Sequence, residues 1–157
     1  MIDLRHNRAL TLVEILVVVS IIAVLATFVI TLTLRVENQS KENALANAYA
    51  LVETALQEYH DYKGEFPVQP VRDANFAADH VELMYEALRS VPDSRAVLTK
   101  INGVLIKGGS GDKWQMCDVW GTALDYIYVP GDNFPELISA GPDRKFDTGD
   151  DIRNQDL

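Results

Sequence analysis

The chain has 157 residues, a formal net charge of −9 and 48% hydrophobic residues. The charges of the first 34 residues cancel, so the remaining 123 residues, with 21 acids and 12 bases, carry the whole negative charge. An acidic chain without a basic stripe argues against nucleic-acid binding, because the phosphate backbone requires a cationic surface. Cys117 is the only cysteine, which excludes an intramolecular disulfide and a zinc site built from cysteines.

The first predicted element is an apolar helix over residues 10–34, a run of 25 residues with one charge, Glu14. At about 1.5 Å per residue, such a helix crosses a hydrocarbon core of roughly 30 Å. Arg5 and Arg8 give the short N-terminal side a small basic excess, which favours a cytoplasmic N-terminus and an external C-terminal domain. The run is longer than the roughly 7–15 apolar residues of a secretory signal peptide and shows no clean A-x-A cleavage site. A membrane anchor is therefore the simplest interpretation.

Glu14 is not explained by anchoring alone. A carboxylate at the centre of a membrane helix costs about 2.5–3.5 kcal/mol on insertion scales, and less near its end. A plain anchor gains nothing from that cost, so the residue indicates a partner of opposite charge. The alternative is that the carboxylate reaches the lipid head groups.

A second, amphipathic helical pattern follows the apolar run. Apolar residues recur at spacings of three and four across residues 44–59, which predicts a stripe that packs against a domain. Gly64 and Pro67 are typical of a helix end. One helix over residues 10–63 would be roughly 80 Å long, and two helices with a hinge at residues 37–40 are the alternative.

Shorter elements are predicted in the next part of the chain. Asp79 is expected to cap a helix over residues 80–91, which Pro92 ends. The dipeptide Asn102-Gly103 lies between apolar runs and predicts a type I′ hairpin. A helix that reaches Ile101 is the competing interpretation.

The last part of the chain predicts a small sheet. Residues 108–113 are rich in glycine but lack the G-x-x-x-x-G-K-[ST] spacing, so they are expected to form a flexible loop and not a phosphate site. Short strands are predicted at residues 123–129 and 136–139. Helices first and an antiparallel sheet last indicate an α+β fold. The three histidines are far apart in the sequence and are expected at the surface or its boundary, and no catalytic constellation is recognisable.

Four aspartates lie within nine residues near the C-terminus: Asp143, Asp147, Asp150 and Asp151. Clustered carboxylates repel one another unless a cation or strong hydrogen bonds offset the repulsion. Calcium binds about 6–8 oxygens from carboxylates and carbonyls. Taken alone, the cluster predicts a calcium loop or a solvated acidic surface equally well.

The N-terminal residues carry a resemblance to a known family. A short basic leader followed by Ala9-Leu10-Thr11-Leu12-Val13-Glu14 resembles the prepilin signal of type IV pilins and type II secretion pseudopilins. The resemblance implies that a prepilin peptidase cuts between Ala9 and Leu10 and methylates Leu10. Glu14 then becomes the fifth residue of a 148-residue mature chain, where it pairs with the N-terminal amine of a neighbouring subunit. The family usually has glycine before the cut and phenylalanine or methionine after it, so Ala9 and Leu10 depart from the pattern.

The C-terminal residues independently resemble the major pseudopilin of type II secretion, through residues 118–121, 139–143 and 148–152. In that family a calcium ion holds the loop after the last strands. The matching positions imply three carboxylate ligands, which are Asp143, Asp150 and Asp151. Main-chain carbonyls around Ala140 and Thr148 would complete the ligand shell. Asp147 has no implied role.

The two resemblances imply a pilin-like architecture with a prepilin leader at 1–9, a transmembrane and filament-core helix at 10–34, its amphipathic continuation at 35–64 and a globular head with the calcium loop at 65–157. The implied function is a structural, non-enzymatic subunit of a type II secretion pseudopilus. Its partners would be further copies in a helical filament, other pseudopilins, the prepilin peptidase and the bacterial inner membrane, which it would cross once with its head in the periplasm. The alternatives are a type IV pilus subunit, a minor pseudopilin, or a membrane-anchored periplasmic binding module.

Overall fold

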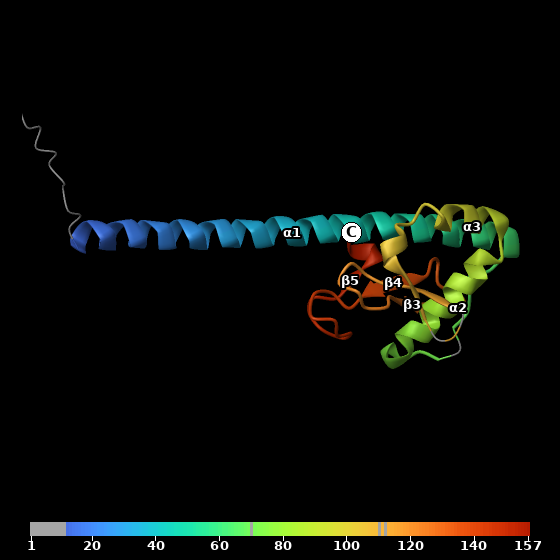
Figure 1. The fold of residues 1–157 in the computed structure, drawn as a ribbon. Coiled ribbons are helices and arrows are strands. Elements are labelled where there is room, and N and C mark those ends of the chain that lie inside the picture. Colours follow the sequence, from blue (N-terminus) through green and yellow to red (C-terminus); the bar gives the residue numbers. More distant parts are fainter. Residues whose placement is uncertain (1–11, 70, 110, 112) are drawn as a thin grey trace, which may run out of the picture. The chain divides into compact units, whose positions relative to one another are not determined.

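The structure is a computed structural model, and it describes residues 12–69, 71–109, 111 and 113–157. The chain divides into two compact units, Met1–Ser40 and Lys41–Leu157. The second unit contains the end of the long first helix together with all the other helices and strands (Figure 1).

Helix α1 runs over Leu12–Lys63. No glycine or proline interrupts this segment of the sequence, and the helix continues through residues 37–40, where the alternative prediction placed a hinge. Gly64 ends the helix as predicted: it has a φ of +81°, and its N–H donates to the carbonyl of His60 at 2.7 Å.

The core of the second unit forms against the predicted apolar stripe of α1. Leu45, Val52 and Leu56 are at most 1% exposed. They belong to one cluster of buried side chains with residues of the later helices and strands, which includes Val81, Met84, Leu88, Met116, Leu124, Tyr126 and Leu137. Burial of large apolar side chains contributes about 1.5–3 kcal/mol each, so this cluster holds the unit together.

The helices after α1 begin at other residues than the sequence predicted. Asp73 caps the 3₁₀ helix η1 (Ala74–Phe76), and α2 continues directly from it over Ala77–Arg89. Asp79 therefore lies in the first turn of α2 and does not cap it. Pro92 does not end a helix but opens the next one, α3 (Pro92–Leu98). Proline suits a first helical position because the N–H that it lacks has no partner there.

The predicted hairpin at Asn102-Gly103 is wrong. A type I′ turn requires positive φ at both central residues, whereas Asn102 has a φ of −58° and its side chain accepts a hydrogen bond from the N–H of Val104. It caps the 3₁₀ helix η2 (Gly103–Leu105). The hairpin forms later, where β1 (Ile106–Gly108) pairs with β2 (Trp114–Met116) on either side of the glycine-rich loop.

The C-terminal sheet has the antiparallel order β3-β4-β5. Its strands are β3 (Asp125–Ile127), β4 (Glu136–Ser139) and β5 (Ile152–Arg153), followed by the 3₁₀ helix η3 (Asn154–Asp156). The first two strands lie within the predicted ranges, and the third was not predicted. Helices first and antiparallel strands last confirm the α+β fold class.

Candidate functional site

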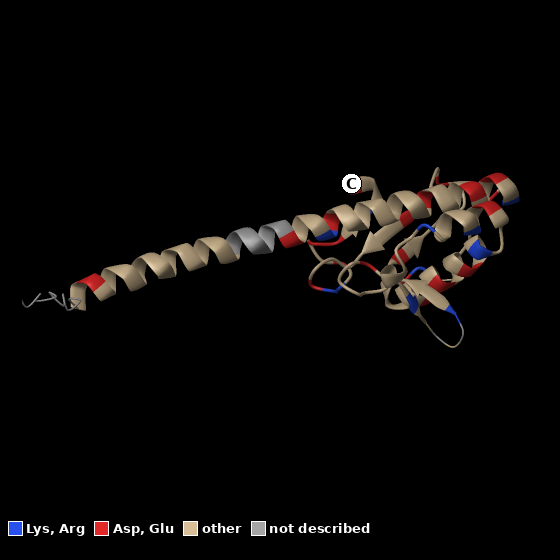
Figure 2. Ribbon diagram, turned by 45° about the horizontal axis from the view of Figure 1, so that its top comes forward, with Lys and Arg blue, Asp and Glu red and all other residues tan. Residues whose placement is uncertain are grey.

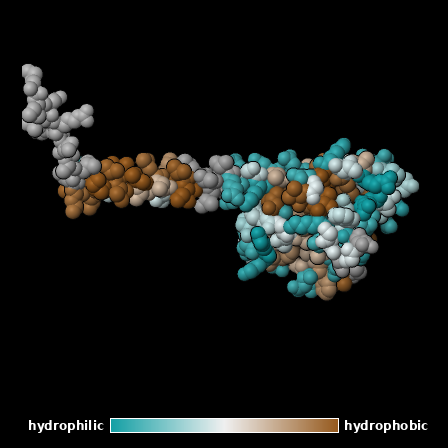
Figure 3. Space-filling view, viewed as in Figure 1, coloured by the Kyte–Doolittle hydropathy of each residue, from teal (hydrophilic) through white to brown (hydrophobic). Residues whose placement is uncertain are grey.

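The apolar part of α1 is the first candidate site. Leu12–Ile30 form a segment of 19 residues that is long and apolar enough to cross a membrane, and none of their side chains is buried within the chain (Figure 3). The hydroxyls of Ser20 and Thr27 donate to carbonyls one turn earlier, those of Leu16 and Ala23, at 2.8 and 2.9 Å, which removes their need for water. An apolar surface of this size requires lipid or other apolar helices around it.

Glu14 lies in the first turn of α1 and is the only charged residue of Leu12–Ile30. A negative charge at this end of a helix is favoured by the helix dipole. Figure 2 shows how few charges this part of α1 has and how many acidic residues the second unit has. The predicted processing residues, Ala9 and Leu10, lie outside the described residues.

The second candidate site is the aspartate loop, which we define as residues 140–151 between β4 and β5. Its carboxylates accept hydrogen bonds from backbone N–H groups of the same loop. Asp150 Oδ2 accepts from the N–H of Asp143 at 3.0 Å, and Asp143 Oδ1 accepts from the N–H of Lys145 at 2.8 Å. Asp151 Oδ2 accepts from the N–H of Asp147 at 2.9 Å. These bonds fold the loop back on itself with its carboxylates spread along it.

Asp150 receives a further bond, from the hydroxyl of Thr148 to Oδ1 at 2.6 Å. This bond and the N–H of Asp143 both favour the ionised carboxylate, so they lower the pKa of Asp150 below its ordinary value. Asp150 therefore keeps its negative charge under more acidic conditions than an ordinary aspartate does.

The structure brings the predicted calcium ligands onto one loop but does not gather them around one point. Within the described residues, no group of three or more histidine, cysteine, aspartate or glutamate side chains is positioned to hold a metal ion. Asp143 and Asp150 are linked directly, whereas Asp151 is linked to Asp147. Calcium binding by Asp143, Asp150 and Asp151 stays a prediction.

The two ends of the aspartate loop meet at Gly141, which has a φ of +62°. A Cβ atom at this position would overlap the backbone oxygen of Asp150, which no side chain tolerates. Gly141→Ala is therefore expected to lower the free energy of unfolding by more than the roughly 1–3 kcal/mol typical of a strained φ alone, as measured by urea denaturation.

Gly131→Ala is the control for that measurement. Gly131 also has positive φ, +107°, but a Cβ there would meet no atom within 4 Å. Gly131→Ala therefore measures the loss of stability that positive φ alone causes, without a close contact of the Cβ atom. Equal losses in the two variants would contradict the conclusion that the loop ends require glycine.

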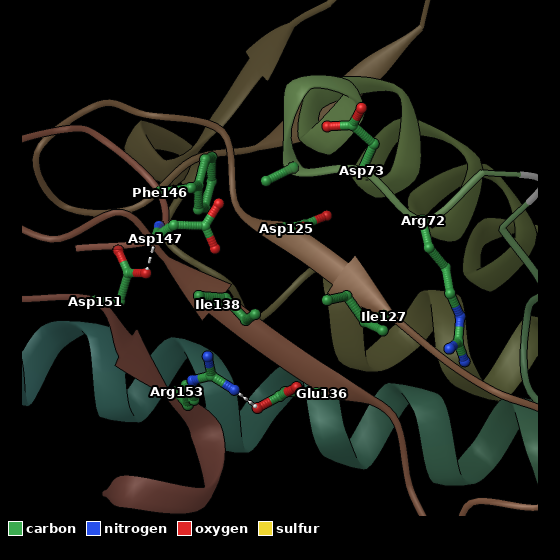
Figure 4. Close-up of a pocket in the computed structure, with 11 residues that line it drawn as sticks. Arg72, Asp73, Asp125, Ile127, Glu136, Ile138, Phe146, Asp147, Asp151 and Arg153 are labelled. Carbon is green, nitrogen blue, oxygen red and sulfur yellow. Dashed lines mark hydrogen bonds and ion pairs between the residues drawn. The ribbon is translucent and has the colours of Figure 1, made fainter. Parts of the chain in front are cut away.

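A cleft of about 420 Å³ opens beside the aspartate loop (Figure 4). Asp147 and Asp151 lie on one side of it and Arg72 on the other. Arg153 in this cleft is paired with Glu136 at 2.6 Å. Of the three predicted calcium ligands, Asp151 lines this cleft, whereas Asp143 and Asp150 do not.

The prediction that every histidine is at the surface or its boundary is wrong for His80, which is 1% exposed. Its Nδ1 lies 2.7 Å from Oδ1 of Asp125, which is 2% exposed and also accepts from the N–H of Tyr126. A buried partner of opposite polarity offsets the cost of removing such groups from water. The pair joins α2 to β3, and its members are 45 residues apart, so no local pattern in the sequence reveals it. His60 is partly exposed as predicted, and His6 lies outside the described residues.

An exposed apolar helical segment with an acid in its first turn, followed along the chain by an α+β unit, is typical of a pilin-like protein. In agreement with this class, the model of the prokaryotic N-terminal methylation motif matches residues 4–30. The chain is also 33% identical over 154 residues to "Type II secretion system core protein G" of Escherichia coli (strain K12), which covers 96% of this chain and 92% of that protein. The chain belongs to the family of type II secretion system core protein G, which confirms the resemblance. No solved structure gives a significant match.

Proposed function

We propose that the chain is a structural subunit of the pseudopilus of a type II secretion system, assembled through its N-terminal helix. The observation that carries this function is the similarity to core protein G, which is 33% identical to this chain over 96% of its length. The exposed apolar part of α1 supports assembly through that helix. Its apolar side chains are not covered by the rest of the chain, so they require a partner or lipid around them. We assign the chain a structural role in assembly and no catalytic role.

Before assembly the subunit crosses the inner membrane once. The small basic excess of the leader supports a cytoplasmic N-terminus and a periplasmic head. A prepilin peptidase then removes residues 1–9 and methylates Leu10, as the methylation motif over residues 4–30 supports. The new amine is four residues from Glu14, within the same apolar segment.

Glu14 would pair with the N-terminal amine of a neighbouring copy in the filament. Both charges lie in apolar surroundings, where pairing offsets much of the cost of leaving water. A single polar pair among otherwise apolar helices also sets their register, as a buried polar residue does in coiled coils. Homo-oligomerisation and its register would thus depend on one carboxylate.

The aspartate loop would bind calcium, held by Asp143, Asp150 and Asp151 and by the carbonyls of Ala140 and Thr148. The donor set fits this ion, which prefers hard oxygen ligands. In addition, Asp151 Oδ1 is buried and has no hydrogen-bond partner among the described residues, and a cation would satisfy such an atom. The bound ion would offset the repulsion among the loop carboxylates.

The proposed function is tested by the mass of the chain extracted from membranes. We expect the loss of residues 1–9 and the addition of one methyl group at Leu10. Ala9→Gly is expected to be cut normally, because it keeps a small residue before the cut, and Ala9→Leu to be cut slowly. An intact, unmethylated Met1 in a strain with an active prepilin peptidase would refute the assignment.

A further inference from the structure

Asp118 holds a buried carboxylate in the turn between β2 and β3, where it is 2% exposed. Its Oδ1 accepts from the N–H groups of Trp120 and Thr122 at 3.0 and 2.8 Å. Its own N–H donates to the carbonyl of Thr122 at 2.7 Å. These local bonds define the turn and use only one of the two carboxylate oxygens.

The second oxygen of Asp118 reaches the base of the aspartate loop. Oδ2 accepts from the hydroxyl of Ser139, the last residue of β4, at 2.7 Å. The Ser139 oxygen in turn accepts from the N–H of Gly141 at 3.1 Å. Ser139 and Ala140 are 0% exposed, so water does not compete for these bonds. Ala140, whose carbonyl is a proposed calcium ligand, thus lies inside a turn that is closed by Ser139 and held by Asp118.

The negative charge of Asp118 determines the direction of these bonds. A hydroxyl has one proton and two lone pairs. Because Oδ2 of a carboxylate only accepts, Ser139 must donate its proton to Asp118 and present a lone pair to Gly141. Asparagine at position 118 would keep the two turn bonds of Oδ1 but would present an NH₂ group to Ser139. The Ser139 oxygen would then accept twice, and its proton would lose its acceptor.

The other end of the aspartate loop is held in a similar way. The hydroxyl of Tyr49 on α1 donates to the carbonyl of Ile152, the first residue of β5, at 2.9 Å. Burial, followed by the nearby charge of Asp118, raises the pKa of Tyr49, so the phenol stays a neutral donor. Both ends of the loop are therefore tied to buried groups, while the side chains of Asp143 and Asp147 are exposed.

We propose that Asp118 is a positioning residue for the cation site of the aspartate loop, and that it acts through Ser139 on the peptide groups of Ala140 and Gly141. This inference rests on the proposed binding of calcium. Groups that orient metal ligands without touching the metal typically contribute 10–100-fold to metal affinity. Ser139 and Asp118 would contribute in this way by fixing the backbone at the base of the loop, around Ala140 and Gly141, before the ion binds.

The test compares calcium affinities of the full processed chain in detergent micelles, measured by isothermal titration calorimetry. Ser139→Ala and Asp118→Asn are expected to weaken calcium binding at least about tenfold. Ser94→Ala is the matched control. Ser94 is also 0% exposed and makes one buried hydrogen bond, to the carbonyl of Ala55 at 2.8 Å, but it joins α3 to α1 and does not bond to the loop. It is expected to lose stability and to keep its calcium affinity.

Amide hydrogen exchange of the calcium-free chain provides a second readout. Ser139→Ala is expected to speed exchange at Gly141, whose N–H loses its acceptor, while Ser94→Ala leaves that amide unchanged. If Ser139→Ala bound calcium as tightly as the parent chain, or if Ser94→Ala weakened binding equally, the positioning role would be overturned and calcium binding would stand. If the parent chain bound no calcium, the proposed ion would be refuted and the positioning role with it, whereas the pseudopilus assignment would stand. If the amide of Gly141 exchanged as slowly in Ser139→Ala as in the parent chain, the hydrogen bond from Gly141 to Ser139 would not be what protects it, and the proposed role of Ser139 would be refuted.

Discussion

Replacing Glu14 by alanine is expected to abolish filament formation while the head stays folded. Alanine enters a membrane more easily than a carboxylate, by about 2.5–3.5 kcal/mol at a helix centre and less near its end, so membrane insertion should not suffer. The loss would fall on assembly, because the N-terminal amine of the neighbouring copy would have no negative partner. Electron microscopy of cells that overproduce the variant measures filaments, and circular dichroism of the purified chain measures folding.

Two further variants sharpen this result. Glu14→Gln keeps the size and the hydrogen-bonding ability of the side chain but removes its charge, so it should fail like the alanine variant if the amine is the partner. Glu42→Ala removes an exposed acid of the same helix outside the apolar part, and it should assemble normally. Normal filaments from both Glu14 variants would show that the carboxylate only reaches the lipid head groups.

Calcium is expected to raise the melting temperature of the chain, and a chelator to lower it. A ligand that binds only the folded state at a hundred times its Kd adds about 2.7 kcal/mol, which corresponds to roughly 10 °C for a unit of this size. Asp150→Asn should remove most of that shift, because it neutralises a proposed ligand. Asp132→Asn, an exposed aspartate outside the aspartate loop, should keep it. If calcium raised the melting temperature equally in the two variants, Asp150 would not be a calcium ligand and the loop would be only a charged surface.

The calcium effect also has an expected pH dependence. The pKa of Asp150 is lowered, first by the hydroxyl of Thr148 and then by the N–H of Asp143. The stability that this ionised group contributes is present above the ordinary aspartate pKa of about 3.9 and is lost as the pH falls through the lower value of the folded state. The calcium-dependent shift should therefore be constant from neutral to mildly acidic pH and decline only below about pH 4. A decline near pH 6 would point to a histidine instead.

The structure differs from the sequence-based predictions where two local patterns competed. Asn102-Gly103 is typical of a hairpin, but the short helix η2 begins there because Asn102 can cap a helix as readily as it can enter a turn. Pro92 was expected to end one helix and instead opens α3, since proline is compatible with both positions. Such residues interrupt regular structure reliably, but the type of the next element depends on which neighbouring segment finds a surface to pack against.

By itself, the sequence determined the apolar helix with its single carboxylate, the amphipathic stripe that continues it, the α+β order and the family. Each of these features depends on residues that are close together in the sequence, either within one or two helical turns or in a short motif. The periodicity and charge of the sequence therefore predict them directly. Only the tertiary structure decided which buried polar groups meet: His80 with Asp125 and Asp118 with Ser139, which are 45 and 21 residues apart. A buried charge is tolerated only where folding brings it hydrogen-bond donors, and such contacts form when α2, the turn after β2 and the C-terminal strands pack together.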